Sequence, residues 1–107
     1  MLDAIGNKWY ELEKDLEDDA VGWARRRGWY SRKYRSAGRR SAPDRIFIRD
    51  GRVLFVEFKR PGEEPIPLQF EEHTQLQAVG ADVVWVDSIE DFKAVIRDRE
   101  NRGPADR

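Results

Sequence analysis

The stretch that most constrains the fold is residues 43–60, PDRIFIRDGRVLFVEFKR. Two runs rich in β-branched and aromatic residues flank an Asp-Gly pair, which favours a two-residue type I′ turn. The sequence therefore predicts a β-hairpin with strands over 44–49 and 52–59. With Asp50 and Gly51 as the turn, directly opposed residues have numbers that sum to 101, as 50 and 51 do.

This register opposes Asp44 to Glu57. Two unit charges about 5 Å apart repel by about 3 kcal/mol at an effective dielectric constant near ~20. Either one acid keeps its proton through a raised pKa, or a cation lies between the two side chains. Magnesium or manganese fits best, because few protein ligands leave room for water and phosphate. Strand alternation places Lys59 on the face of Glu57, so the three side chains predict metal-assisted phosphodiester hydrolysis.

The spacing of apolar residues, together with residues that cap or end helices, predicts the other elements of the chain. Helical periodicity ends at Gly28, and Ser88 is placed to cap the last helix. The expected elements are a helix over about 3–27, a short strand over 29–34, the hairpin, a helix over 68–79, a buried strand over 82–86 and a final helix from 89. This α, three-strand, α, strand, α order predicts an α/β fold.

Composition limits the kind of protein. We expect a single domain over 1–97 and a charged, flexible tail over 98–107, because 107 residues cannot supply two independent cores. The chain has no cysteine, no apolar run of membrane-spanning length and no signal-peptide pattern, so we expect a soluble intracellular protein.

Charge is balanced overall but clustered locally. Lys and Arg total 20 against 21 for Asp and Glu, whereas residues 24–43 contain no acid. A basic segment next to paired acids suits binding to the phosphate backbone of a nucleic acid. The alternative is that these residues form a solvated charged surface. The basic residues of this segment are Arg25, Arg26, Arg27, Arg32, Lys33, Arg35, Arg39 and Arg40.

Pro43-Asp44 followed by Glu57-Phe58-Lys59 resembles the PD-(D/E)XK nuclease motif. Over about residues 13–96 the sequence resembles the VRR-NUC domain, especially its small standalone phage forms. The resemblance implies a restriction-endonuclease-like αβββαβ(α) core with a mixed central sheet flanked by helices. Relatives often have glycine where this chain has Ala42, which affects the shape of the loop before the motif.

The same resemblance implies the roles of the site residues. Asp44 and Glu57 bind Mg²⁺ or Mn²⁺ together with the backbone carbonyl of Phe58, and Lys59 assists catalysis. The family also uses an acid of the first helix as a metal ligand and a catalytic residue.

For that helical acid the resemblance favours Glu17, whereas a helical wheel slightly prefers Glu13, one turn earlier. Gln69 resembles a helix glutamine that supports the catalytic lysine or contacts the substrate. The expected DNA-binding residues are Arg32, Lys33, Arg35, Arg39 and Arg40. For His73, with no second histidine or cysteine nearby, we expect a surface position.

The resulting hypothesis is a metal-dependent DNA endonuclease selective for branched DNA, either similar to Holliday-junction resolvases or acting on flaps. Family resemblance further implies a homodimer, because a four-way junction has two strands to cut, and action in the cytoplasm, the host cell's if the gene is phage-encoded. Two alternatives remain: a non-catalytic nucleic-acid-binding module and an RNA-directed nuclease of the same fold.

Overall fold

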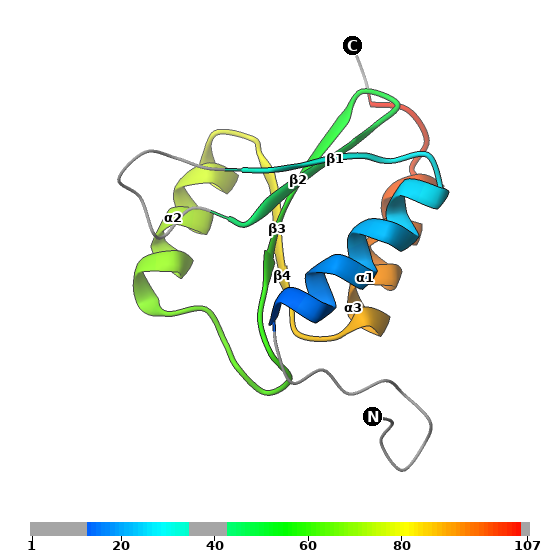
Figure 1. Cartoon of the computed structure of the whole chain (residues 1–107). Helices are drawn as coiled ribbons and strands as arrows, with labels where there is room; N and C mark the ends of the chain where they lie inside the picture. The colour runs from blue at the N-terminus through cyan, green and yellow to red at the C-terminus, as the bar shows by residue number, and fades with distance from the viewer. Residues whose placement is uncertain (1–12, 35–42, 106–107) are drawn as a thin grey trace.

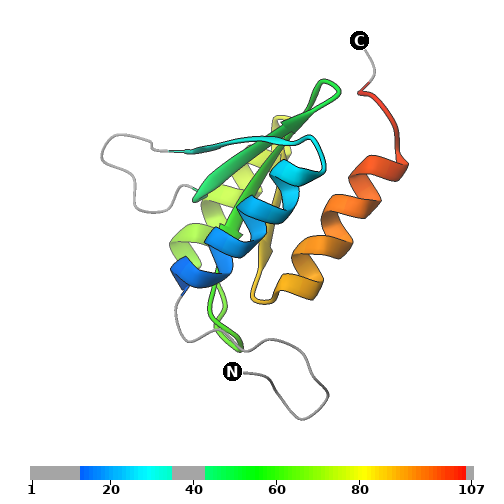
Figure 2. The same cartoon turned by 45° about the vertical axis from the view of Figure 1, so that its right-hand side comes forward.

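The computed structural model describes residues 13–34 and 43–105, which form a mixed sheet with helices on both faces (Figures 1 and 2). The predicted α/β class and element order are confirmed, and residues 3–12 of the expected first helix lie outside the described ranges. No described helix is long and apolar enough to cross a membrane. The elements are α1 (Glu13–Arg26), β1 (Tyr30–Lys33), β2 (Arg45–Arg49), β3 (Arg52–Phe58), α2 (Pro67–Ala78), β4 (Asp82–Val86) and α3 (Ile89–Asn101).

The hairpin of β2 and β3 has the predicted turn and register. Asp50 and Gly51 have φ values of 53° and 79°, and a type I′ turn requires positive φ at both of these positions. The ladder pairs Arg49 with Arg52 and ends with Arg45 opposite Val56, so paired numbers sum to 101 as expected.

The four strands lie in the order β1-β2-β3-β4. The first three are antiparallel neighbours, whereas β4 runs parallel to β3 and is reached through α2. Helix α2 covers one face of the sheet, and α1 and α3 pack side by side on the other (Figures 1 and 2). The layers are therefore one helix, the sheet and two helices.

The hydrophobic core lies between the sheet and the α1–α3 layer. The Phe92 ring of α3 packs against the rings of Phe47 and Phe58, with centroids 5.1 Å and 5.7 Å apart. Leu54, Val56 and Phe58 of β3 are fully buried in this core. Because side chains alternate along a strand, Glu57 points to the opposite face, toward α2.

Helix α3 continues to Asn101, beyond the start of the expected flexible tail over 98–107. Its Glu100 carboxylate accepts a 3.0 Å hydrogen bond from the indole nitrogen of buried Trp29. Farther on, the Ala105 amide donates to the carbonyl of Asp50 in the hairpin turn over 3.0 Å. The described part of this segment therefore packs against the domain, because it supplies acceptors and donors that the rest of the fold uses.

Candidate active site

The carboxylates of Asp44 and Glu57 meet at the open end of the hairpin. Asp44 lies one residue before β2, and its amide still donates to the carbonyl of Val56 over 3.1 Å. Its Oδ2 accepts a 2.8 Å hydrogen bond from the amide of Phe58. The strand register thus holds Asp44 against the end of β3, where Glu57 is 2% exposed.

The two acids hold a proton near neutral pH. Burial, and next to it the charge of Glu57, raise the pKa of Asp44 from 3.8 to about 7. Burial also raises the pKa of Glu57, while the hydrogen bond from Asp44 lowers it. The pair therefore favours a proton on Asp44, which is the first of the two solutions expected for opposed carboxylates.

Lys59 adds a positive charge beside this pair. Its amide donates to the Val86 carbonyl over 2.9 Å, which extends the β3–β4 pairing past the end of β3. Its charge lowers the pKa of both Glu57 and Glu13, although burial raises both pKa values overall. The structure thus brings together the three side chains expected to perform the chemistry.

Both candidate helical acids of α1 act on the site electrostatically. Glu17 is 7% exposed, and its Oε2 pairs with Arg45 Nε at 2.6 Å and Lys33 Nζ at 3.4 Å. Its charge contributes to the raised pKa of Asp44. Burial raises the pKa of Glu13, and the charges of Lys59 and Asp44 act on it. Glu17 as the ligand remains a prediction.

Gln69 lies in the first turn of α2 and is 8% exposed. Its Oε1 accepts a 2.9 Å hydrogen bond from the amide of Ile66, the residue that caps the helix. The side chain therefore stabilises the start of α2, and support of the catalytic lysine remains a prediction.

His73 is not on the surface, so that expectation was wrong. It is 5% exposed, and its Nε2 lies 3.9 Å from Oε1 of Glu57. One signal was available in the sequence: Gln69 and His73 are four residues apart and share a face of α2. That face packs toward the end of β3, which spacing alone does not show.

The expected DNA-binding residues are only partly described. Arg32 and Lys33 are exposed on β1, and the Arg32 guanidinium lies 4.4 Å from the ring centroid of Tyr30. Arg35, Arg39, Arg40 and also Ala42 lie outside the described residues.

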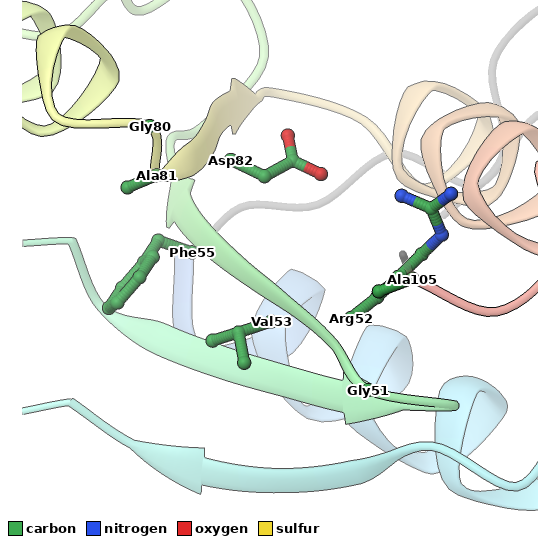
Figure 3. Close-up of a pocket in the computed structure, with 8 residues that line it drawn as sticks. All are labelled: Gly51, Arg52, Val53, Phe55, Gly80, Ala81, Asp82 and Ala105. Carbon is green, nitrogen blue, oxygen red and sulfur yellow. The ribbon is translucent and has the colours of Figure 1, made fainter. Parts of the chain in front are cut away.

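A hollow of about 300 Å³ lies away from this site, at the turn end of the hairpin (Figure 3). It is lined by the turn, by Val53 and Phe55 of β3 and by the start of β4. None of the expected site residues lines it.

Comparisons with known proteins show which proteins this chain is similar to. No family model matches the sequence. The chain is 39% identical over 85 residues to "Putative nuclease p44" of Acyrthosiphon pisum secondary endosymbiont phage 1, across 78% of this chain and 90% of that protein. A solved structure titled "VRR_NUC domain" superposes with a TM-score of 0.73 at 30% identity, covering 79% of this chain and 94% of that one.

Proposed function

Because this chain belongs to the VRR-NUC family of nucleases, we propose that it is a Mg²⁺- or Mn²⁺-dependent endonuclease that hydrolyses phosphodiester bonds in DNA. The observation that carries the proposal is the carboxylate pair of Asp44 and Glu57 at the open end of the hairpin. A raised pKa at a position beside a second acid and a lysine is typical of a catalytic centre.

The donor atoms at this end of the hairpin fit a hard divalent ion. Asp44 and Glu57 offer two adjacent carboxylates, and the charge of Glu57 raises the pKa of Asp44, so a bound cation would relieve their repulsion. No three His, Cys, Asp or Glu side chains in the described ranges are grouped as a metal site. The Phe58 carbonyl, water and phosphate would therefore supply other ligands, as magnesium prefers. When bound, the ion supplies Lewis-acid activation of the phosphate and a water of lowered pKa.

The remaining residues orient the reactants. The Lys59 ammonium donates hydrogen bonds to the attacking water or to a phosphate oxygen and balances the charge that develops there. Glu17 completes the ligand set from α1, with Glu13 as the alternative. Gln69 holds the start of α2 and supports Lys59 or the substrate.

DNA approaches over the basic segment that precedes Asp44. Arg32 and Lys33 of β1, with Arg35, Arg39 and Arg40, contact the phosphates. We further propose selectivity for branched DNA and action as a homodimer, because two sites are needed to cut a four-way junction symmetrically. The phage relative supports action in the cytoplasm of a host cell.

The test is a cleavage assay on labelled substrates with and without Mn²⁺. The substrates are a four-way junction, a flap, a linear duplex, a single strand and an RNA hairpin. We expect Mn²⁺-dependent cutting of DNA, strongest on branched forms. Preferential cutting of RNA would favour the RNA-directed alternative, and DNA binding without product in Mn²⁺ would favour the non-catalytic module.

The Lys59→Ala variant tests the assignment of roles. We expect cleavage to fall about 10²–10³-fold, because a preorganised donor at the reacting phosphate is lost. Lys14→Ala is the matched control, since the Lys14 side chain is 79% exposed and pairs with Asp18 one turn along the same helix. Undiminished nicking by Lys59→Ala would refute the assignment.

A further inference from the structure

His73 is a buried polar side chain next to the carboxylate pair that the proposed mechanism does not use. Its Nε2 lies 3.9 Å from Oε1 of Glu57, and the two residues are 5% and 2% exposed. Each atom lacks a hydrogen-bond partner within the part of the chain that the structure describes. Leaving a buried polar atom unpaired costs free energy, so two such atoms facing each other require an explanation.

Rigid elements hold both atoms in place. His73 follows Gln69 by one turn of α2, and the cap at Ile66 fixes the start of that helix. Glu57 lies in β3 opposite Trp85 of β4. Since 3.9 Å exceeds the range of an N–H···O hydrogen bond, a shift of less than about 1 Å is enough to form one.

The chemistry of the two groups is complementary. A neutral imidazole carries one N–H, on either of its two ring nitrogens. A Glu57 carboxylate oxygen that carries no proton can only accept hydrogen bonds. The tautomer with its proton on Nε2 is therefore the one that suits this contact.

We propose that His73 is a positioning residue, whose Nε2–H donates to Oε1 of Glu57 and leaves Oε2 for Asp44 and the divalent ion. This inference rests on the proposed metal-dependent function. A hydrogen-bond partner behind a ligating carboxylate fixes its orientation and raises metal affinity. His73 is assigned to this outer position because its Nε2 faces a Glu57 oxygen that has no hydrogen-bond partner among the described residues.

A matched pair of variants tests the role of the donor. Glutamine and methionine have similar lengths, but only His73→Gln keeps an N–H donor. We expect His73→Met to weaken Mn²⁺ binding to the DNA-free protein about 10–100-fold in isothermal titration calorimetry, and His73→Gln to stay close to wild type. Thermal unfolding without metal should show no loss of stability in His73→Met, because an unpaired buried polar atom is removed.

The possible results separate this inference from the proposed function. Wild-type Mn²⁺ affinity in His73→Met would overturn the inference alone, whereas a wild-type protein that takes up no Mn²⁺ would overturn the metal dependence as well. Nitrogen hyperfine coupling in pulsed EPR of bound Mn²⁺ would make His73 a ligand and overturn the positioning role. His73→Leu, whose side chain has no polar atom, is a second variant without a donor, so the test does not depend on the folding of His73→Met.

Discussion

Burial and the neighbouring carboxylate of Glu57 both raise the pKa of Asp44. The pKa rises from 3.8 to about 7, so the folded protein binds this proton more tightly than the unfolded chain does. The stability contributed by the group is therefore full below about pH 4 and is lost as pH rises through about 7. A divalent ion bound as proposed would remove this cost, because it would compensate the charges of the ionised pair.

Asp44→Asn should make metal-free stability less dependent on pH. Asparagine keeps an oxygen that can accept the Phe58 N–H but carries no charge beside Glu57. We expect the fall in melting temperature between pH 4 and 7 to become smaller and the melting temperature at pH 8 to rise, as measured by thermal unfolding in EDTA. Glu71→Gln, at an exposed position of α2, is the control and should leave the profile unchanged. An unchanged slope in Asp44→Asn would contradict the raised pKa.

The two acids of α1 can be separated by their effects on metal binding. If Glu17 is the ligand, Glu17→Gln weakens Mn²⁺ binding about 10-fold or more, whereas Glu13→Gln has a smaller effect. Calorimetry on both variants measures the difference directly. The reverse order would assign the role to Glu13, whose pKa responds to Lys59 and Asp44.

At the scale of the elements, Glu100 joins the end of α3 to the rest of the domain. Its carboxylate accepts from the Trp29 indole, from Arg27 at 2.6 Å and from Arg49 at 2.8 Å. Arg27 directly follows α1, Trp29 directly precedes β1, and Arg49 ends β2. One carboxylate thus fixes the position of three elements relative to α3.

Glu100→Ala should destabilise the protein. Removing the carboxylate leaves the buried indole of Trp29 and two guanidinium groups without their acceptor, which we expect to cost about 1–3 kcal/mol of unfolding free energy. Urea denaturation measures this change, and Glu71→Ala on the exposed side of α2 is the control. Equal stabilities of the two variants would show that the residues after Arg97 do not contribute, as expected of a flexible tail.

At the scale of the whole molecule, charge is segregated although the net charge is only −1. A protein of this net charge gains nothing from bulk attraction to DNA, so binding must come from the local basic segment. Within that segment Lys33 is paired with Glu17, whereas Arg32 stacks over Tyr30 on an exposed face of β1. The arginines among residues 35–42 are further candidates for phosphate contacts.

The double variant Arg39→Ala/Arg40→Ala should weaken duplex binding without changing the fold. Each lost phosphate contact lowers the slope of log K against log salt by about 0.9, so the pair should lower it by about 1.8. Fluorescence anisotropy in Ca²⁺ at several salt concentrations measures the slope. Arg97→Ala, at an exposed position of α3, is the control, and a slope unchanged from wild type would exclude these two contacts.

Much of the architecture was predictable because it follows from local rules. The Asp-Gly turn sets the hairpin register, and the register alone brings Asp44 to the end of β3 beside Glu57. Ser88 caps α3 by accepting from the Asp91 amide, as its position before the helical pattern predicts. Each of these features depends on residues within a few positions of one another or on a two-residue alternation.

Packing between helices and the sheet decided the rest. The burial of His73 against Glu57 requires α2 to cross the sheet at one particular position, and the role of Glu100 requires the end of α3 to meet α1 and β2. No local pattern contains that information, because a helix sequence shows which of its residues share a face but not what that face contacts. Tertiary packing therefore buries His73, which was expected on the surface. It also makes Glu100, which was expected in a flexible tail, a contact between α3 and the rest of the domain.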